Sequence, residues 1–499
     1  MPWHDVGCAF VGTAACDISR HFIQRWNQIR SRKIRSAPKG SAKRIFQRLV
    51  PGLLPSHPCS PWTETKLSTV LVDPRQSTMC TVQALRSVSN WSLGVQSDDK
   101  KGFRKSFRKL FHQNLPSQNK RDIELDETKH QIGLETSILK AYINMIHEAE
   151  NFIYIENQYF ISYILESHED QYNDDDFDSE GNLANAKSPH KTASDFHQLS
   201  NSNGLVKNRI CEAIYLRILR AYNERKLFRV FIMLPSLTAF KGEVGTSSGT
   251  YIHAILHYTR QSLFIGEYAL IPRLKQVVPN PEDYVSVCSL RTFDEWPDGS
   301  IRTELIYIHS KVMIVDDKKM ILGSANINDR SMLGFRDSEL DIIIESNSDN
   351  DLIVGKFGNT SVKVHPFIQR FRRSLMAEFL GMLPKISKEF KVNSKYDLLD
   401  DPVSSEFFHD LWNATAVNNG ELFEKIFNCI PGSGLLTFRQ CTERRNEIPL
   451  VISDRQKAVE LLKNVKGYII PFYSDFLANE SLECPVGSIE RMIPEVVWT

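Results

Sequence analysis

The 499-residue chain is 41% hydrophobic and 24% charged, with a formal net charge of +1. This length allows two or more domains around a large core, and the near-zero charge gives no electrostatic argument for nucleic-acid binding. Nine scattered cysteines without a Cys-x-x-Cys pair disfavour a zinc site or a disulfide framework and fit a reducing cytoplasm. No apolar run reaches the ~18 residues of a membrane span, so any membrane contact should be peripheral.

The first elements of the chain are a helix, a loop and a strand. Residues 10–30 predict a helix, because apolar side chains recur at helical spacing. Residues 50–77 are rich in Pro and Ser and predict a loop, and the alternation in 80–88 predicts a strand that opens a domain. The apolar stripe of the helix consists of Ile18, Phe22, Trp26 and Ile29.

Two low-complexity insertions interrupt the pattern that follows. Residues 97–121 are basic, and residues 163–204 are first acidic and then rich in Ser and Asn. Both have few core-forming side chains, so we expect them to be mobile.

The rest of the chain alternates apolar strands with amphipathic helices, which indicates an α/β fold with a sheet buried on both faces. Helices are expected at 137–149, 205–224, 251–264 and 366–382. Strands are expected at 152–156, 228–235, 284–290, 304–315, 319–322 and 339–345.

The most informative stretch, HSKVMIVDDKKMILGSAN, combines His-x-Lys, an aspartate and Gly-Ser-x-Asn. In one continuous strand, His309 and Lys311 would project from the same face. An imidazole beside a fixed ammonium suits chemistry on a phosphate diester, and Ser324 and Asn326 can donate to phosphate oxygens. Asp316 ends the predicted strand, where a carboxylate can hold the turn.

A histidine that carries a proton at neutral pH needs a partner for its other ring nitrogen. Glu339, which opens the next predicted strand, is the candidate. The plainer interpretation of each piece is a solvated edge position, an ordinary Gly-Ser turn and a surface glutamate. Only the full spacing favours a site.

Polar residues also close the apolar strand 152–156, at the end of a strand where α/β sites usually lie. They are Glu156, Asn157 and Gln158. An ordinary loop at the end of a strand is an equally good interpretation of these residues alone.

The His309–Asn326 stretch resembles the second HKD motif of the phospholipase D superfamily, and GSANINDRSMLGFRDSEL extends the resemblance. Four other stretches are similar to eukaryotic phosphatidylcholine-specific phospholipase D enzymes: MPWHDVG, RHFIQRWN, IENQYFIS and the terminal MIPEVVWT. The resemblance covers nearly the whole chain, apart from the two insertions and parts of residues 386–480.

The resemblance implies a phospholipase D-like fold, in which helices flank a mixed sheet and two HKD motifs on two lobes build one active site. It implies hydrolysis of phosphatidylcholine to phosphatidic acid and choline through a phosphohistidine, without a metal or other required cofactor. The implied roles are acid/base for His309, phosphate binding for Lys311, Ser324 and Asn326, a structural role for Asp316, orientation of His309 for Glu339, and lining of the cleft for Asn157 and Gln158.

His-x-Lys occurs once in the chain, and the resemblance implies that the first motif would lie before MPWHDVG. We therefore expect a truncated first lobe in residues 1–77, a complete second lobe in 78–385, and an extension in 386–499 that packs on the catalytic lobe. Such a chain should be inactive alone. A truncated sequence and a true half-enzyme that pairs with a chain supplying the first motif both remain open.

Arg20 and Arg25 resemble the family's basic site for polyphosphoinositides, which are the implied activators. A solvated helix face is the alternative. Residues 100–111 place three phenylalanines four residues apart among basic side chains, which predicts an interfacial amphipathic helix or, equally, a disordered basic linker.

The expected partners are a phospholipid membrane surface and, by resemblance, small GTPases, with no nucleic acid. The expected location is cytoplasmic and peripheral on membranes. The rival functions are a non-catalytic phosphoinositide-binding scaffold and a phosphodiesterase or nuclease of the same superfamily; the lack of a basic stripe argues against the nuclease.

Overall fold

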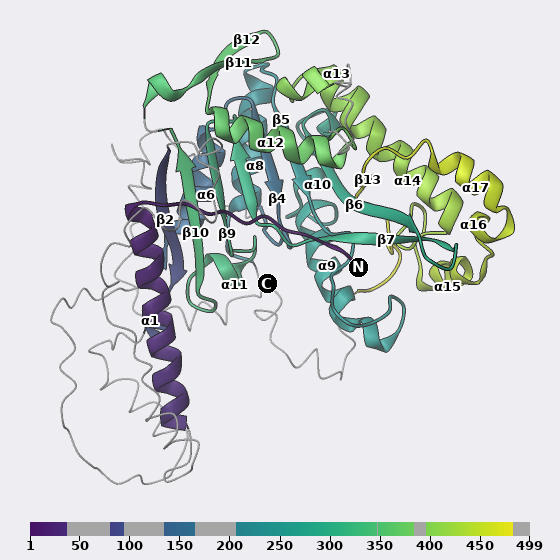
Figure 1. The fold of residues 1–499 in the computed structure, drawn as a ribbon, viewed down its shortest axis with the longest axis horizontal. Helices are drawn as coiled ribbons and strands as arrows, with labels where there is room; N and C mark the ends of the chain where they lie inside the picture. Colours follow the sequence, from purple (N-terminus) through teal and green to yellow (C-terminus); the bar gives the residue numbers. More distant parts are fainter. Residues whose placement is uncertain (37–79, 94–133, 165–205, 347, 384–395, 483–499) are drawn as a thin grey trace.

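The computed structural model describes residues 1–36, 80–93, 134–164, 206–346, 348–383 and 396–482 (Figure 1). Most described strands join one sheet: β1 (Trp3–His4), β2 (Thr81–Val88), β3 (Glu135–Thr136), β4 (Phe152–Glu156), β5 (Arg229–Met233), β6 (Val285–Glu295), β7 (Ile301–Ile308), β8 (Val312–Val315), β9 (Lys319–Gly323), β10 (Glu339–Glu345) and β13 (Ile469–Pro471). Within the described residues this sheet has eleven strands in the order β1-β7-β6-β5-β4-β8-β9-β10-β2-β3, and β13 pairs with β6. Parallel and antiparallel pairs are both present.

Helices flank this mixed sheet, which confirms the predicted α/β class (Figure 1). The longer helices are α1 (Thr13–Ser36), α6 (Ser137–Glu148), α8 (Ile210–Asn223), α9 (Thr250–Leu263), α12 (Pro366–Phe379), α14 (Ala414–Phe427), α15 (Phe438–Asn446) and α17 (Arg455–Leu462). The short ones are α4 (Asn90–Leu93), α10 (Leu270–Lys275), α11 (Asp329–Met332), α13 (Ser405–Phe407) and α16 (Leu450–Ser453), and β11 (Ile353–Phe357) and β12 (Thr360–Val364) form a separate hairpin.

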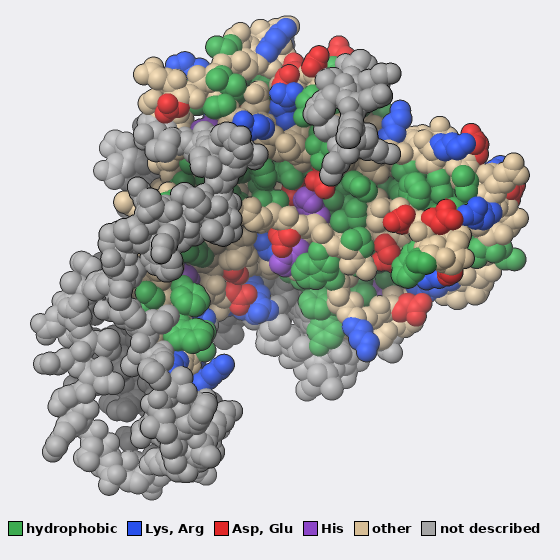
Figure 2. All heavy atoms as spheres, viewed as in Figure 1, with side chains coloured by type: hydrophobic (Ala, Val, Ile, Leu, Met, Phe, Trp, Pro, Cys, Tyr) green, Lys and Arg blue, Asp and Glu red, His purple; other side chains and the backbone are tan. Residues whose placement is uncertain are grey.

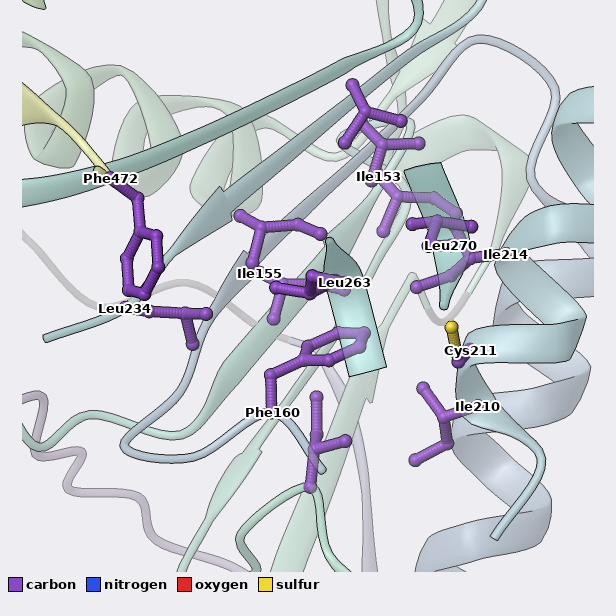
Figure 3. Close-up of a cluster of buried hydrophobic side chains, with 14 of the residues drawn as sticks. Ile153, Ile155, Phe160, Ile210, Cys211, Ile214, Leu234, Leu263, Leu270 and Phe472 are labelled. Carbon is purple, nitrogen blue, oxygen red and sulfur yellow. The ribbon is translucent and has the colours of Figure 1, made fainter. Parts of the chain in front are cut away.

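The central strand β4 is buried on both faces, as its apolar sequence predicts. Ile153 and Ile155 belong to a core cluster with residues of α6 and α8. Figure 3 shows both side chains with those of α8. Phe152 and Tyr154 alternate with them and pack in a second cluster with α12. Because side chains alternate along a strand, β4 contributes to both hydrophobic clusters, and its end lies between them.

The predicted strand 304–315 is wrong in one respect, because it is two strands. β7 ends at Ile308 and pairs with β6, whereas β8 begins at Val312 and pairs with β4 and β9. The intervening residues 309–311 therefore cross the sheet from one side of the β6-β5-β4 group to the other. A single strand cannot change its neighbours in this way, so the chain leaves the ladder where the motif begins.

The predicted three-part division is not visible as separate sheets. β1 comes from residues 1–77 and β13 from 386–499, yet both join the sheet of residues 78–385. The division itself stays a prediction. Four predicted features lie outside the described residues: the loop at 50–77, the basic insertion 97–121 with its helix at 100–111, the second insertion 163–204 except its first two residues, and the tail MIPEVVWT. None of the described helices is long and apolar enough to cross a membrane.

Candidate functional site

The link between β7 and β8 reaches the end of β4, where it is hydrogen-bonded to the buried carboxylate of Glu156. Ser310 donates from Oγ to Glu156, and Tyr154 donates from its hydroxyl to the same carboxylate at 2.5 Å. His4 of β1 adds a third contact, with 2.8 Å between its Nε2 and Oε2 of Glu156. One buried acid thus joins β1, β4 and the motif.

Burial lowers the pKa of His4, but its bond to Glu156 and the negative charges of Glu156, Glu378 and Asp5 outweigh that effect. The pKa of His4 is therefore raised above its usual value. A charged imidazolium beside a carboxylate is the form that compensates for burial of both groups.

Lys311 is the buried cation of the site, with 6% of its surface exposed. Its ammonium donates to Oε1 of Gln158 at 3.1 Å and to the carbonyl oxygen of His309. Gln158 in turn donates to the hydroxyl of Tyr307 at 2.7 Å. Both acceptors are neutral, and among the residues that the structure describes no carboxylate lies at hydrogen-bond distance from this ammonium.

Burial lowers the pKa of Lys311 to about 8, against the opposing charges of Asp5, Glu339 and Asp341. The group is still mostly protonated at neutral pH. A cation held at the end of a sheet, away from bulk water, interacts more strongly with an oxyanion than an exposed lysine does.

The structure pairs His309 with Asp5 in place of the expected Glu339. Nδ1 of His309 lies 2.7 Å from Oδ2 of Asp5, and the imidazole is one-third exposed. Glu339 instead accepts from the hydroxyls of Ser324 at 2.6 Å and Ser331 at 2.8 Å. The expected role of Glu339 is thus corrected: the crossing link carries His309 toward β1, and Glu339 remains beside its own serines.

The Gly-Ser-x-Asn turn lies beside Lys311, because Gly323 donates its backbone N–H to the carbonyl oxygen of Lys311 at 3.2 Å. The backbone N–H groups of Ser324 and Ala325 donate to one oxygen of the buried Asp341, at 2.9 and 3.1 Å. A Cβ on Gly323 would overlap Asp341, so this turn requires glycine. The turn is therefore fixed from behind by a carboxylate.

The two predicted phosphate ligands of this turn differ in state. The Ser324 hydroxyl is engaged with Glu339. The side-chain oxygen of Asn326 is buried and has no hydrogen-bond partner within the described part of the chain. Burial raises the pKa of Glu339, against its two serine bonds, and raises that of Asp341 to about 7.

Asp316 lies away from this cluster and binds the start of β4. Its two oxygens accept from the backbone N–H groups of Glu150, Asn151 and Phe152 at 2.7 to 2.8 Å. Its φ of +51° places it in the left-handed region, which an aspartate tolerates in a turn. The structural role expected of Asp316 stays a prediction.

Of the two residues expected to line the cleft, only Gln158 contacts Lys311. Asn157 is fully buried, and its side-chain oxygen accepts from the backbone N–H groups of Tyr159 and Ile327, both at 3.2 Å. Asn157 thus fastens the loop after β4 to the segment after the Gly-Ser turn. The lining of a cleft by Asn157 stays a prediction.

The two arginines of α1 have different surroundings. Arg20 is half-exposed and lies 3.4 Å from Asp17, whereas Arg25 donates to the carbonyl oxygen of Ser92. The phosphoinositide site stays a prediction. Figure 2 shows acidic and basic side chains interspersed among the coloured residues of the face that carries α14–α17, without a continuous basic stripe there.

The described residues contain no group of three His, Cys, Asp or Glu side chains placed to hold a metal ion. Sequence reasoning missed three residues of the site: Asp5, His4 and the buried Asp341. The first two occur in MPWHDVG, which was noticed only as a stretch of resemblance. Asp341 had a signal, since a carboxylate within an apolar strand is uncommon unless it has partners.

Comparisons with known proteins show the family of the chain. A family model described as phospholipase D matches residues 1–304 and 291–395. The whole chain is 32% identical to Phospholipase D1 of Homo sapiens, covering 37% of that protein, and 33% identical to Phospholipase D2 of Bos taurus, covering 42% of it. The chain thus spans about two fifths of these relatives. Among solved structures, NucT from Helicobacter pylori matches at 14% sequence identity. The match covers 42% of this chain and 76% of the NucT chain, and its TM-score of 0.20 is too low to inform the fold.

Proposed function

This chain belongs to the phospholipase D family, and on that premise we propose that it forms the acid/base half of a phospholipase D catalytic unit. The reaction is hydrolysis of phosphatidylcholine to phosphatidic acid and choline. The nucleophilic histidine comes from a first motif, carried by a second chain or by a longer form of the protein.

In the first step, that histidine attacks phosphorus, and a P–N bond forms as the bond to the choline oxygen breaks. His309 gives its proton to the departing oxygen. In the second step, water loses a proton to His309 and attacks phosphorus, and the P–N bond breaks to release phosphatidic acid. Covalent catalysis with a shuttling proton divides one difficult displacement into two easier ones.

One observation supports this proposal most: the ammonium of Lys311 donates to Gln158, two residues after β4, and to the backbone carbonyl oxygen of His309. Asp5 occupies Nδ1 of His309, which leaves Nε2 for proton transfer. The buried ammonium of Lys311 stabilises negative charge on the phosphoryl oxygens, and Gln158 directs it. Ser324 and Asn326 add donors once a phosphate displaces the bond from Ser324 to Glu339.

The substrate is part of a membrane, so the unit acts at a phospholipid surface. Polyphosphoinositides as activators and small GTPases as partners follow from the family resemblance alone. Phosphoinositide binding without turnover is a second proposal. It rests on α1, where Arg20 and Phe22 are both more than half exposed.

Choline release from phosphatidylcholine vesicles tests the main proposal. The chain is mixed with a second chain that supplies the first motif, and His309→Asn is compared with His409→Asn. His409 is a matched control, since it is 34% exposed against 32% for His309 and also lies beside an aspartate. General acid/base catalysis contributes roughly 10²–10⁴-fold, so we expect a loss of that size in His309→Asn alone. Equal turnover by the two variants would overturn the role of His309.

A further inference from the structure

We propose that Arg260, in the second half of α9, is the centre of a second anion-binding site on this chain, which takes a phosphate group. None of the stretches that carry the family resemblance contains Arg260. The site does not depend on the role proposed for His309. Its phosphate group comes either from free phosphate or from a lipid headgroup, and the two sources are separated by experiment.

Arg260 is a buried cation that uses only part of its hydrogen-bonding capacity. Its exposed surface is 3%, and Nη1 donates to the carbonyl oxygen of Leu477 at 2.9 Å. Nε and Nη2 are buried as well, and neither has a hydrogen-bond partner among the residues that the structure describes. Unpaired buried donors are uncommon, because burial removes the hydrogen bonds that water would make.

The two unpaired nitrogens form the edge of the guanidinium that binds oxyanions in a bidentate manner. On this edge the N–H groups of Nε and Nη2 point the same way, at a spacing that matches two oxygens of a carboxylate or a phosphate. The same edge of Arg372 holds the buried carboxylate of Asp317, at 2.9 Å from Nε and 2.6 Å from Nη2. Arg260 has the same edge without such an acid.

The charge of Arg260 is only weakly compensated. Burial lowers the pKa of Arg260, and the negative charge of Asp475 opposes that effect. Asp475 accepts from the backbone N–H of Gly434 at 2.8 Å, and within the described ranges no ion pair joins it to Arg260. A guanidinium stays protonated at neutral pH, and a buried charge without a paired counterion favours binding of an anion.

Arg260 lines a cavity of about 170 Å³, together with other residues of α9 and with residues 478–482. A single water needs only ~10–15 Å³, so this cavity has room for a polyatomic ion. Gln261 and Ser481 also line it and can donate to further oxygens. Ala478 and Ser481 are exposed, so the cavity opens to solvent.

Glu480 also lines the cavity and opposes an anion there. One of its oxygens accepts from the backbone N–H of Phe438 at 2.7 Å, which partly stabilises the negative charge. Glu480→Gln keeps an acceptor for that N–H and removes the charge. Phosphate should therefore bind more tightly to this variant.

The plainer alternative is that ordered water fills the cavity and satisfies both nitrogens of Arg260. A cavity that only holds water has no reason to bind phosphate with a measurable affinity. The two interpretations therefore differ in whether phosphate binding depends on the bidentate edge.

The test titrates inorganic phosphate into the Lys311→Met chain at constant ionic strength, because this substitution removes the cation at the end of β4. We expect saturable binding by calorimetry. Adding Arg260→Lys should weaken it at least about tenfold, because lysine keeps the charge but lacks the bidentate edge. Arg439→Lys is the matched control, since Arg439 is 85% exposed. No saturable binding, or equal binding by the two lysine variants, would overturn the proposal.

A second measurement covers the case in which Arg260→Lys does not fold. Phosphate should raise the melting temperature of the Lys311→Met chain, because a ligand stabilises the state that binds it. Adding Glu480→Gln should increase both this rise and the calorimetric affinity. An unchanged or weaker affinity in Glu480→Gln would show that phosphate does not bind in this cavity.

Vesicles separate the two sources of the phosphate group. The Lys311→Met chain is sedimented with phosphatidylcholine vesicles that contain or lack phosphatidic acid. If retention by phosphatidic acid is abolished by Arg260→Lys and by competing inorganic phosphate, the site takes a lipid headgroup. If retention does not depend on Arg260 while calorimetric binding does, the site takes free phosphate. Choline release enters none of these measurements, so failure of the proposed function and failure of this proposal are distinguishable.

Discussion

Lys311 and Gln158 join the two parts of the chain that make the site, with 3.1 Å between the ammonium nitrogen and Oε1 of the amide. Lys311 belongs to the link between β7 and β8, and Gln158 is the second residue after β4. The amide accepts from Lys311 with its oxygen and donates to Tyr307 with its nitrogen. It therefore directs the cation without cancelling its charge.

Exchanging the amide of Gln158 for a carboxylate tests whether the positive charge of Lys311 must stay uncancelled for anion binding. Gln158→Glu keeps an acceptor for Lys311 but adds a negative charge where an oxyanion is expected. A hydrogen bond to a charged group contributes about 1.5–3 kcal/mol, so we expect at least about tenfold weaker binding of inorganic phosphate by calorimetry. The melting temperature should not fall, because the ion pair replaces a neutral bond. Unchanged phosphate affinity would show that Lys311 does not bind the anion.

The pKa of Lys311, about 8, predicts opposite effects of pH on binding and on stability. Phosphate affinity should fall as pH rises through about 8, because the neutral amine attracts no anion. Stability changes in the opposite direction. In the unfolded chain Lys311 has a pKa of 10.5, so between about 8 and 10.5 the unfolded state binds more protons than the folded state, and the contribution of Lys311 to the free energy of unfolding rises with pH. Lys311→Met removes both dependences, and calorimetric titrations and thermal melts across this range check them.

Most of the sheet could be predicted because periodicity is local. The strands at β4, β5 and β10 and the helices at α6, α8 and α12 each bury a repeating set of apolar side chains, and their observed bounds lie close to the expected ones. β1 has two residues and β13 three, which is too short for any period, so their place in the sheet depends on partners distant in sequence.

The candidate site could be predicted only in part, for a related reason. The motif named His309 and Lys311, the end of strand 152–156 named Gln158, and the structure brings Lys311 into contact with Gln158. The break between β7 and β8 could not be predicted, because apolar side chains continue on both sides of it and only the change of neighbouring strands reveals it. The partner of His309 is Asp5, the residue after β1, which lies far outside any sequence window.

The His4–Glu156 pair predicts a pH-dependent contribution to stability. The folded pKa of His4 is raised above about 6.5, so the stabilisation is fully present below that value and is lost as pH rises through the folded pKa. His4→Gln should cost about 1–3 kcal/mol at mildly acidic pH, since it leaves a buried carboxylate with one fewer donor. The cost should shrink at alkaline pH. Urea denaturation at several pH values measures this, and a cost that does not vary with pH would contradict a charged His4.

The turn at Gly323 gives the last prediction, because there a single methyl group should disturb the site through the core. Gly323→Ala would push a Cβ into Asp341, whose carboxylate receives the backbone N–H groups of Ser324 and Ala325. We expect about 1–3 kcal/mol of lost stability from the forced shift, together with weaker phosphate binding. Gly7→Ala is the matched control, since a Cβ there meets nothing within 4 Å.

Asp341 itself makes this prediction depend on pH. Its pKa is raised from 3.8 to about 7 by burial, so its protonated form favours the folded state, and that advantage is lost as pH rises through about 7. The wild type should therefore lose stability relative to Asp341→Asn as pH rises from 3.8 to about 7, because asparagine does not titrate. The amide oxygen of this variant would still accept the two backbone N–H groups of the turn. Thermal melts of both variants below and above neutrality measure these effects. Equal stability of Gly323→Ala and Gly7→Ala would show that the turn is not fixed by this carboxyl group. So would a stability difference between Asp341→Asn and the wild type that does not vary with pH.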